Sequence, residues 1–192
     1  MSHPLDSLVF ITIPEEHHLS AEVPFFDPSI PLPVQLTAPG AKLEPSQLTL
    51  EMILAGMLTV FAYDRENAQL DYYRSILKAV RPGIREEMTE AAILKIRNGD
   101  FELAEEIFLA LHGYAPEDKV TVLNLALLMD ERADSMRRSG LEEDADALDA
   151  SAFEYYRVAM TAEPPMPEAF FNAGFFYLKQ KSYRKARTSP ET

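Results

Sequence analysis

Small residues and prolines recur along this chain at fixed spacings, and this repetition limits the fold more than any other feature. Ala104 precedes Pro116 by twelve residues, and Ala152 precedes Pro164 by the same interval. After each of these prolines, a large apolar residue follows six positions later. Such recurrence indicates stacked copies of one supersecondary unit, because a single unit of this kind cannot bury its own apolar face.

The start of each unit also follows a pattern. A large apolar residue is followed three and four positions later by apolar or small residues, and seven positions later by another large residue. The three sets are Met88, Ala91, Ala92 and Lys95; Val122, Leu125, Ala126 and Met129; and Phe170, Ala173, Gly174 and Tyr177. Lys95 departs from the pattern. Together with the small residue and proline of the second helix, this pattern resembles the tetratricopeptide repeat (TPR) over about residues 85–186. The resemblance implies an all-α array of helical hairpins, an α-solenoid.

The first 45 residues have a different character, since they hold eight of the fourteen prolines. Proline at this density opposes helices and central strands, so residues 1–45 are predicted to form an extended arm. Leu8 to Ile13 could form one short strand. The run from Pro24 to Val34 is rich in large apolar groups, so we expect it to pack on a surface, its own helices among the candidates. The alternative is a mobile leader.

Residues 46–192 are predicted to form the helical array. A helix capped by Ser46 runs to about Tyr63 and is apolar on nearly all sides, so it should be buried. A second helix covers about residues 67–80. These two form either a degenerate unit over residues 46–84 or an unrelated capping pair. The repeats follow at residues 85–118 and 119–166, with an incomplete one at 167–192.

Two departures from the repeat pattern are informative. Fourteen additional residues separate Ala126 from Ala152, and with Gly140 at a turn they predict an elongated helical hairpin. In the last unit, Ala186 should begin a second helix that stops at once. The aromatic helix that starts near Phe170 would then lack a covering partner. The arm, a second copy or a partner protein could cover it.

Two asparagines point to a binding groove. Asn124 and Asn172 each lie two positions before the small residue of their unit. In the family that the chain resembles, asparagine here often holds the backbone of a bound peptide, since an amide both donates and accepts hydrogen bonds. The alternatives are a solvated or capping asparagine and, for the apolar residues, core packing. The apolar residues predicted to line the groove are Ile93, Leu123, Leu127, Phe171 and Phe175.

The composition argues against several classes of function. The net charge of −13 disfavours nucleic acid and anionic lipid as partners. The basic C-terminal segment indicates self-association or a solvated surface. The chain has no cysteine and no metal, cofactor or catalytic motif. It also lacks a secretory signal and an apolar run long enough for membrane insertion, which favours a cytoplasmic protein.

We therefore expect a protein-interaction scaffold or adaptor, and no enzyme, that binds a peptide segment of a partner protein in a concave apolar groove. One alternative is a dedicated chaperone that resembles those of secretion-system translocators. Another is a regulatory domain of a larger protein.

Overall fold

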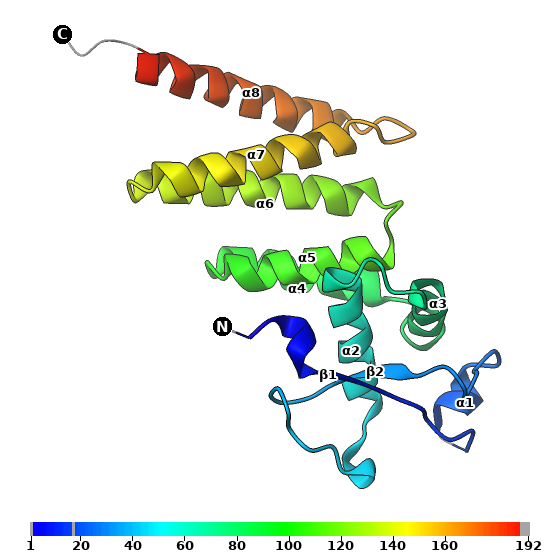
Figure 1. Ribbon diagram of the computed structural model, residues 1–192. Coiled ribbons are helices and arrows are strands. Elements are labelled where there is room, and N and C mark those ends of the chain that lie inside the picture. Colours follow the sequence, from blue (N-terminus) through cyan, green and yellow to red (C-terminus); the bar gives the residue numbers. More distant parts are fainter. Residues whose placement is uncertain (1, 17, 189–192) are drawn as a thin grey trace. The chain divides into compact units, whose positions relative to one another are not determined.

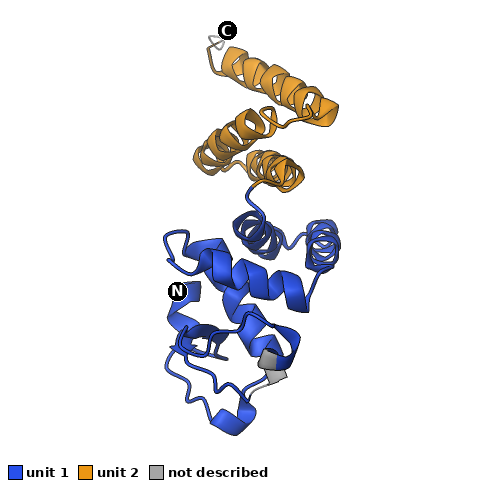
Figure 2. Ribbon diagram, turned by 90° about the vertical axis from the view of Figure 1, so that its right-hand side faces the viewer, with its two compact units in different colours: residues 1–116 blue, residues 117–192 orange. Residues whose placement is uncertain are grey.

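The computed structural model of the protein describes residues 2–16 and 18–188, which are mostly helical (Figure 1). The chain divides into two compact units, the first ending at Pro116 and the second beginning at Glu117 (Figure 2). Residues on both sides of residue 45, where the sequence predicts the arm to end, belong to the first unit.

The first unit begins with an antiparallel ribbon that sequence patterns revealed only in part. The 3₁₀ turn η1 (Pro4–Ser7) leads into β1 (Leu8–Ile11), which pairs with β2 (Leu32–Gln35). The short helix α1 (His18–Glu22) lies between the two strands in the sequence. The predicted strand at Leu8 is therefore present, although it ends at Ile11. Its partner β2 was not predicted, because Pro33 argues against a strand unless the strand lies at an edge.

Helices α2 (Leu50–Tyr63) and α3 (Leu70–Val80) follow. The predicted cap at Ser46 is wrong, because residues Pro45–Gln47 form the 3₁₀ turn η2 and the hydroxyl of Thr49 accepts the backbone N–H of Met52. The expectation that this helix is buried is met for half of its 14 residues, and of the others only Glu51 is exposed. Its buried residues are Ile53, Leu54, Gly56, Met57, Val60, Phe61 and Ala62.

Residues from the proline-rich segment share one apolar core with α2 and α3. The shared core contains Ile13, Leu19, Val23, Leu32 and Val34 from that segment. The hydroxyl of Tyr73 donates to the Pro31 carbonyl at 2.7 Å, and the N–H of Asp27 donates to the Tyr72 hydroxyl at 2.8 Å. Strand β2 lies so close to α2 that a Cβ atom on Gly56 would be 2.4 Å from the Pro33 carbonyl oxygen.

The first unit ends with a hairpin of α4 (Ile84–Arg97) and α5 (Phe101–Tyr114). Gly99 forms the turn with a φ of +78°, a conformation that glycine adopts without strain. The carboxylate of Asp100 then caps α5 by accepting the N–H of Leu103. The small residues Ala92 and Ala104 are fully buried where the two helices pack.

The second unit contains a longer hairpin of α6 (Lys119–Arg138) and α7 (Glu142–Ala159), with Gly140 at the turn and a φ of +76°. These helices have 20 and 18 residues, whereas α4 and α5 have 14 each. The additional residues between Ala126 and Ala152 are therefore helical and form no loose loop.

The last helix, α8 (Pro167–Thr188), is continuous over 22 residues and packs on both α7 and α6. The prediction that a new helix begins at Ala186 is wrong. The expected turn lacks a glycine equivalent to Gly99, and Ser182 instead bonds the carbonyl of Leu178 within the same helix. Nothing local interrupts the helix, so it extends through the position of the turn.

Candidate partner-binding surface of the second unit

Polar contacts fix α8 on the hairpin and decide which of its faces stays exposed. The Lys179 ammonium lies 2.5 Å from an Asp130 oxygen and 2.8 Å from an Asp134 oxygen, both on α6. One turn later, the hydroxyl of Tyr183 donates to Asp134 at 3.2 Å. Burial by itself lowers the pKa of Lys179, but the hydrogen bonds to Asp130 and Asp134 outweigh burial, and the pKa is raised overall.

A second group of charges joins the far end of α8 to α7. The Arg187 guanidinium pairs with Asp146 at 2.8 Å and with Glu142 at 3.1 Å. The hydrogen bond from Arg187 is the main reason that the pKa of Asp146 is lowered. Within the hairpin, Arg137 pairs with the buried Asp149 at 2.5 Å. Part of the basic C-terminal segment thus pairs with acidic residues of the same chain, an outcome that charge counting did not predict.

One face of α8 is buried by aromatic packing. Phe176 is buried with its ring centroid 5.2 Å from that of Tyr156 on α7. Tyr156 also donates a hydrogen bond to Asp130 at 3.1 Å. Burial, followed by the nearby charge of Asp130, raises the pKa of Tyr156. The residues of α8 on the opposite face consequently point away from the hairpin.

That opposite face carries a concentration of exposed apolar side chains. Phe171 and Phe175 are 67% and 56% exposed, and their rings meet edge-to-face with centroids 4.9 Å apart. Leu178 is exposed there as well, whereas the exposed Phe170 and Tyr177 lie on the flank of α8 nearer to α7, where the Tyr177 ring meets that of Phe153. Single exposed apolar residues are ordinary, but a contiguous group on one helix marks an interaction surface.

The structure places most of the predicted groove residues on α6 and α8, which pack against each other. Asn124 is half-buried on α6 and makes no hydrogen bond to a described residue, so its amide is uncommitted. Leu127 on the same helix is exposed, whereas Leu123 is only 7% exposed and offers a partner little surface. Asn172 on α8 donates to the Glu168 carbonyl one turn earlier at 2.8 Å. Ile93 is exposed on α4, in the first unit.

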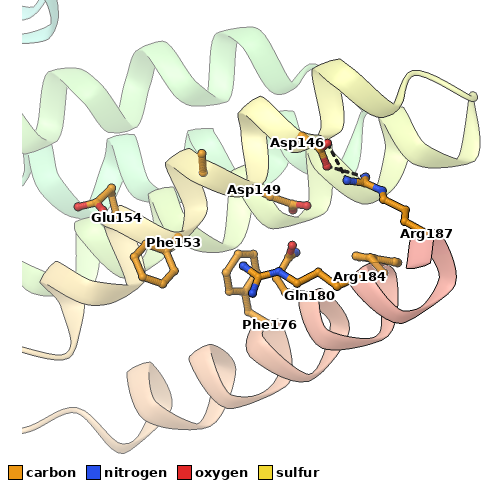
Figure 3. A pocket seen from close by; sticks show the side chains of 10 residues that line it. Asp146, Asp149, Phe153, Glu154, Phe176, Gln180, Arg184 and Arg187 are labelled. Atoms are coloured by element: carbon orange, nitrogen blue, oxygen red, sulfur yellow. Dashed lines mark hydrogen bonds and ion pairs between the residues drawn. The ribbon is translucent and has the colours of Figure 1, made fainter. Parts of the chain in front are cut away.

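A pocket opens between α7 and α8 on the other flank of α8 (Figure 3). Its lining residues are Asp146, Asp149, Ala150, Phe153, Glu154, Phe176, Gln180, Tyr183, Arg184 and Arg187. Figure 3 shows the Arg187–Asp146 pair near one end of this space and Phe153 and Glu154 near the other. One oxygen of Asp149 and the side-chain nitrogen of Gln180 are buried there without a hydrogen-bond partner among the described residues.

Several exposed residues were absent from the sequence-predicted site, above all Phe153, Phe170 and Leu178. From the sequence we expect the aromatic helix that starts near Phe170 to lack a covering partner, but only Phe171 and Phe175 of that helix are among the predicted groove residues. Phe153 carried no sign of exposure, because an aromatic residue within a helix is more often part of the core.

Comparisons with known proteins add no family or relative. No protein-family model matches the chain, and no significant match was found among curated proteins or solved structures. Within residues 2–16 and 18–188, no helix combines the length and apolar character needed to cross a membrane. The same residues hold no group of three or more histidine, aspartate or glutamate side chains arranged to bind a metal ion.

Proposed function

We propose that this protein is a protein-interaction module of the tetratricopeptide type, which binds a peptide segment of a partner on the aromatic face of its second unit. The observation that carries this proposal is the exposed Phe171–Phe175 pair. Two phenylalanines that are more than half exposed and in edge-to-face contact form a rigid apolar surface, and aromatic residues are enriched in protein interfaces.

The surroundings of this pair suit an extended peptide. The Asn124 amide has no hydrogen-bond partner among the described residues, so it can donate to a peptide carbonyl and accept from a peptide N–H. Asn172 keeps one donor engaged within α8, while its side-chain oxygen has no partner among the described residues. Leu127 adds exposed apolar surface on the adjacent helix. Apolar contacts would select the peptide's side chains, and the two amides would hold its backbone.

The proposal is tested by affinity capture from the native lysate with three forms of the protein. The first is the wild type and the second is the Phe171→Ala, Phe175→Ala double variant. The third is a matched control, Phe10→Ala, which removes an exposed phenylalanine from β1 in the first unit. Truncating two central aromatic anchors should cost about 2–4 kcal/mol of binding free energy, a loss of roughly thirtyfold or more.

We expect a specific protein that is captured by the wild type and by Phe10→Ala but not by the double variant. A synthetic peptide from that protein should then bind more weakly when Asn124 is replaced by alanine. Equal capture by all three folded forms would contradict the proposal, since the aromatic face would then contribute nothing to recognition.

A further inference from the structure

Glycines inside the helices of this chain mark close approaches of another backbone, with one exception. At Gly56 in α2, an added Cβ atom would lie 2.4 Å from the Pro33 carbonyl oxygen of β2. At Gly113 in α5, it would lie 2.0 Å from the carbonyl oxygen of Phe61 on α2. At Gly174 in α8, it would meet no described atom within 4 Å. Glycine disfavours a helix interior relative to alanine, so Gly174 weakens α8 without any packing in this structure that requires it.

The repeat pattern indicates what usually covers this position. Ala92 in α4 and Ala126 in α6 occupy the place equivalent to Gly174, and both are 0% exposed. Each lies in a hairpin whose second helix, α5 or α7, packs against the first. Among the described residues, α8 has no second helix following it. Gly174 thus lies where a hairpin partner would cross.

The side chains around Gly174 are exposed, although their equivalents in the preceding hairpin are buried. Phe170 and Tyr177 flank the glycine on α8 and are exposed, whereas their equivalents on α6, Val122 and Met129, are buried. Phe153 on α7 is also exposed, and its ring centroid lies 5.9 Å from that of Tyr177. From Tyr177 toward the C-terminal end of α8, the two helices form a groove. Its lining residues are Phe153, Tyr177, Gln180, Lys181, Arg184, Lys185 and Thr188.

The charge of this groove opposes the charge of the protein as a whole. Lys181 and Arg184 line it and form no ion pair with any described residue, although the chain carries a net charge of −13. Both cations are exposed, so carboxylates of a partner would pair with them. A second copy of α8 would bring further cations, so charge favours a different, acidic partner.

We propose that the groove between α7 and α8 beside Gly174 binds an acidic, amphipathic α-helix of a partner protein. A small residue of that helix lies against Gly174, its apolar side chains contact Phe170 and Tyr177, and its carboxylates face Lys181 and Arg184. This surface is on the opposite flank of α8 from Phe175, so it does not depend on the peptide site proposed above.

The chain itself supplies a suitable probe. Residues 142–160, which include α7, form an acidic helix with the small residue Ala152 that packs on α6. A labelled peptide of this sequence is titrated into the full chain and followed by fluorescence anisotropy. The decisive variant is Gly174→Leu, which fills the open space with a residue that favours helix. Phe175→Ala, on the opposite flank of α8, is the matched control.

We expect the peptide to bind the wild type and Phe175→Ala with similar affinity. Gly174→Leu should weaken binding by about tenfold or more, because a closely packed helix crossing does not accommodate the added side chain. A peptide with Ala152→Leu should lose affinity to a similar degree. The Lys181→Glu, Arg184→Glu double variant, changed only at exposed residues, should also weaken binding and reduce its salt dependence.

Four results would overturn the proposal. The first is that the acidic helix does not bind. The second is that it binds Gly174→Leu as tightly as the wild type, which would happen if the peptide replaced α7 in its packing on α6. A third is tighter binding of an extended peptide of residues 24–36, which would make the groove a site for a proline-rich strand. The fourth is reversible dimerisation in sedimentation that Gly174→Leu abolishes, which would assign the groove to a second copy.

Discussion

The same substitution, glycine to alanine, should have opposite effects at two helix positions of this chain. In an exposed helix interior, alanine is favoured over glycine by about 0.8–1 kcal/mol. At Gly174 the new methyl group would meet no described atom within 4 Å, so this gain should be fully expressed. We therefore expect Gly174→Ala to stabilise the second unit by about 1 kcal/mol, or roughly 4–8 °C in Tm if that unit unfolds alone.

At Gly56 the intrinsic gain is the same, but the methyl group would lie 2.4 Å from the Pro33 carbonyl oxygen and 2.9 Å from the Val34 nitrogen. Ordinary contacts begin near 3.4 Å, so β2 would have to move away by about 1 Å. Overpacking of this kind costs typically 1–3 kcal/mol, and more where the obstacle is backbone. We expect Gly56→Ala to destabilise the first unit by about 1–3 kcal/mol after the helix gain is subtracted.

The assay is urea unfolding followed by far-UV circular dichroism, with hydrogen exchange to assign each transition to peptides of one unit. Each variant is compared with the wild type at two protein concentrations, so that self-association is recognised. The reasoning would be refuted if both variants shifted stability in the same direction. A concentration-independent loss of stability in Gly174→Ala would show that the face is already covered within the chain.

Two further outcomes follow from the polar contacts. Lys179→Met keeps the apolar stem but leaves Asp130 and Asp134 without their cation, so urea unfolding should show the second unit weakened by about 1–2 kcal/mol, between the exposed and buried limits for ion pairs. The control Lys181→Met, at an exposed position with no ion pair to a described residue, should change stability by less than about 0.5 kcal/mol. Burial raises the pKa of Tyr73 from 10.0 to about 12. The stabilisation that the protonated Tyr73 hydroxyl contributes is therefore complete below pH 10 and is lost as the pH rises toward 12. When the free energy of unfolding is measured across that range, Tyr73→Phe should lose less of it than the wild type does.

The helical hairpins could be predicted from the sequence because their determinants are local. Small residues at fixed intervals identified the crossings, and Gly140 identified a turn that needs a positive φ, as Gly99 does in the first unit. The acidic cap at Asp100 likewise acts on a backbone N–H three residues away. Such signals need no knowledge of the rest of the molecule, since helix propensity, capping and turn chemistry act within a few residues.

The candidate surface could be predicted only in part. The spacing of Asn124 and Asn172 placed both on helices that contact each other, and Phe171 and Phe175 are exposed as a groove would require. Leu123 had the same pattern but is buried. Exposure depends on which neighbouring helix covers a position, and sequence spacing alone does not specify that neighbour.

The sequence by itself determined where segments of this chain can approach closely, because glycine and alanine stand at repeating positions. Tertiary structure alone decided what fills those sites. Gly56 is covered by strand β2, Ala126 is buried in the α6–α7 hairpin, and Gly174 is open. It also decided that Lys179 turns inward to Asp130 while Lys181 stays outside. The reason is physical: these choices depend on contacts between residues distant in the chain, whose free energies no local pattern encodes.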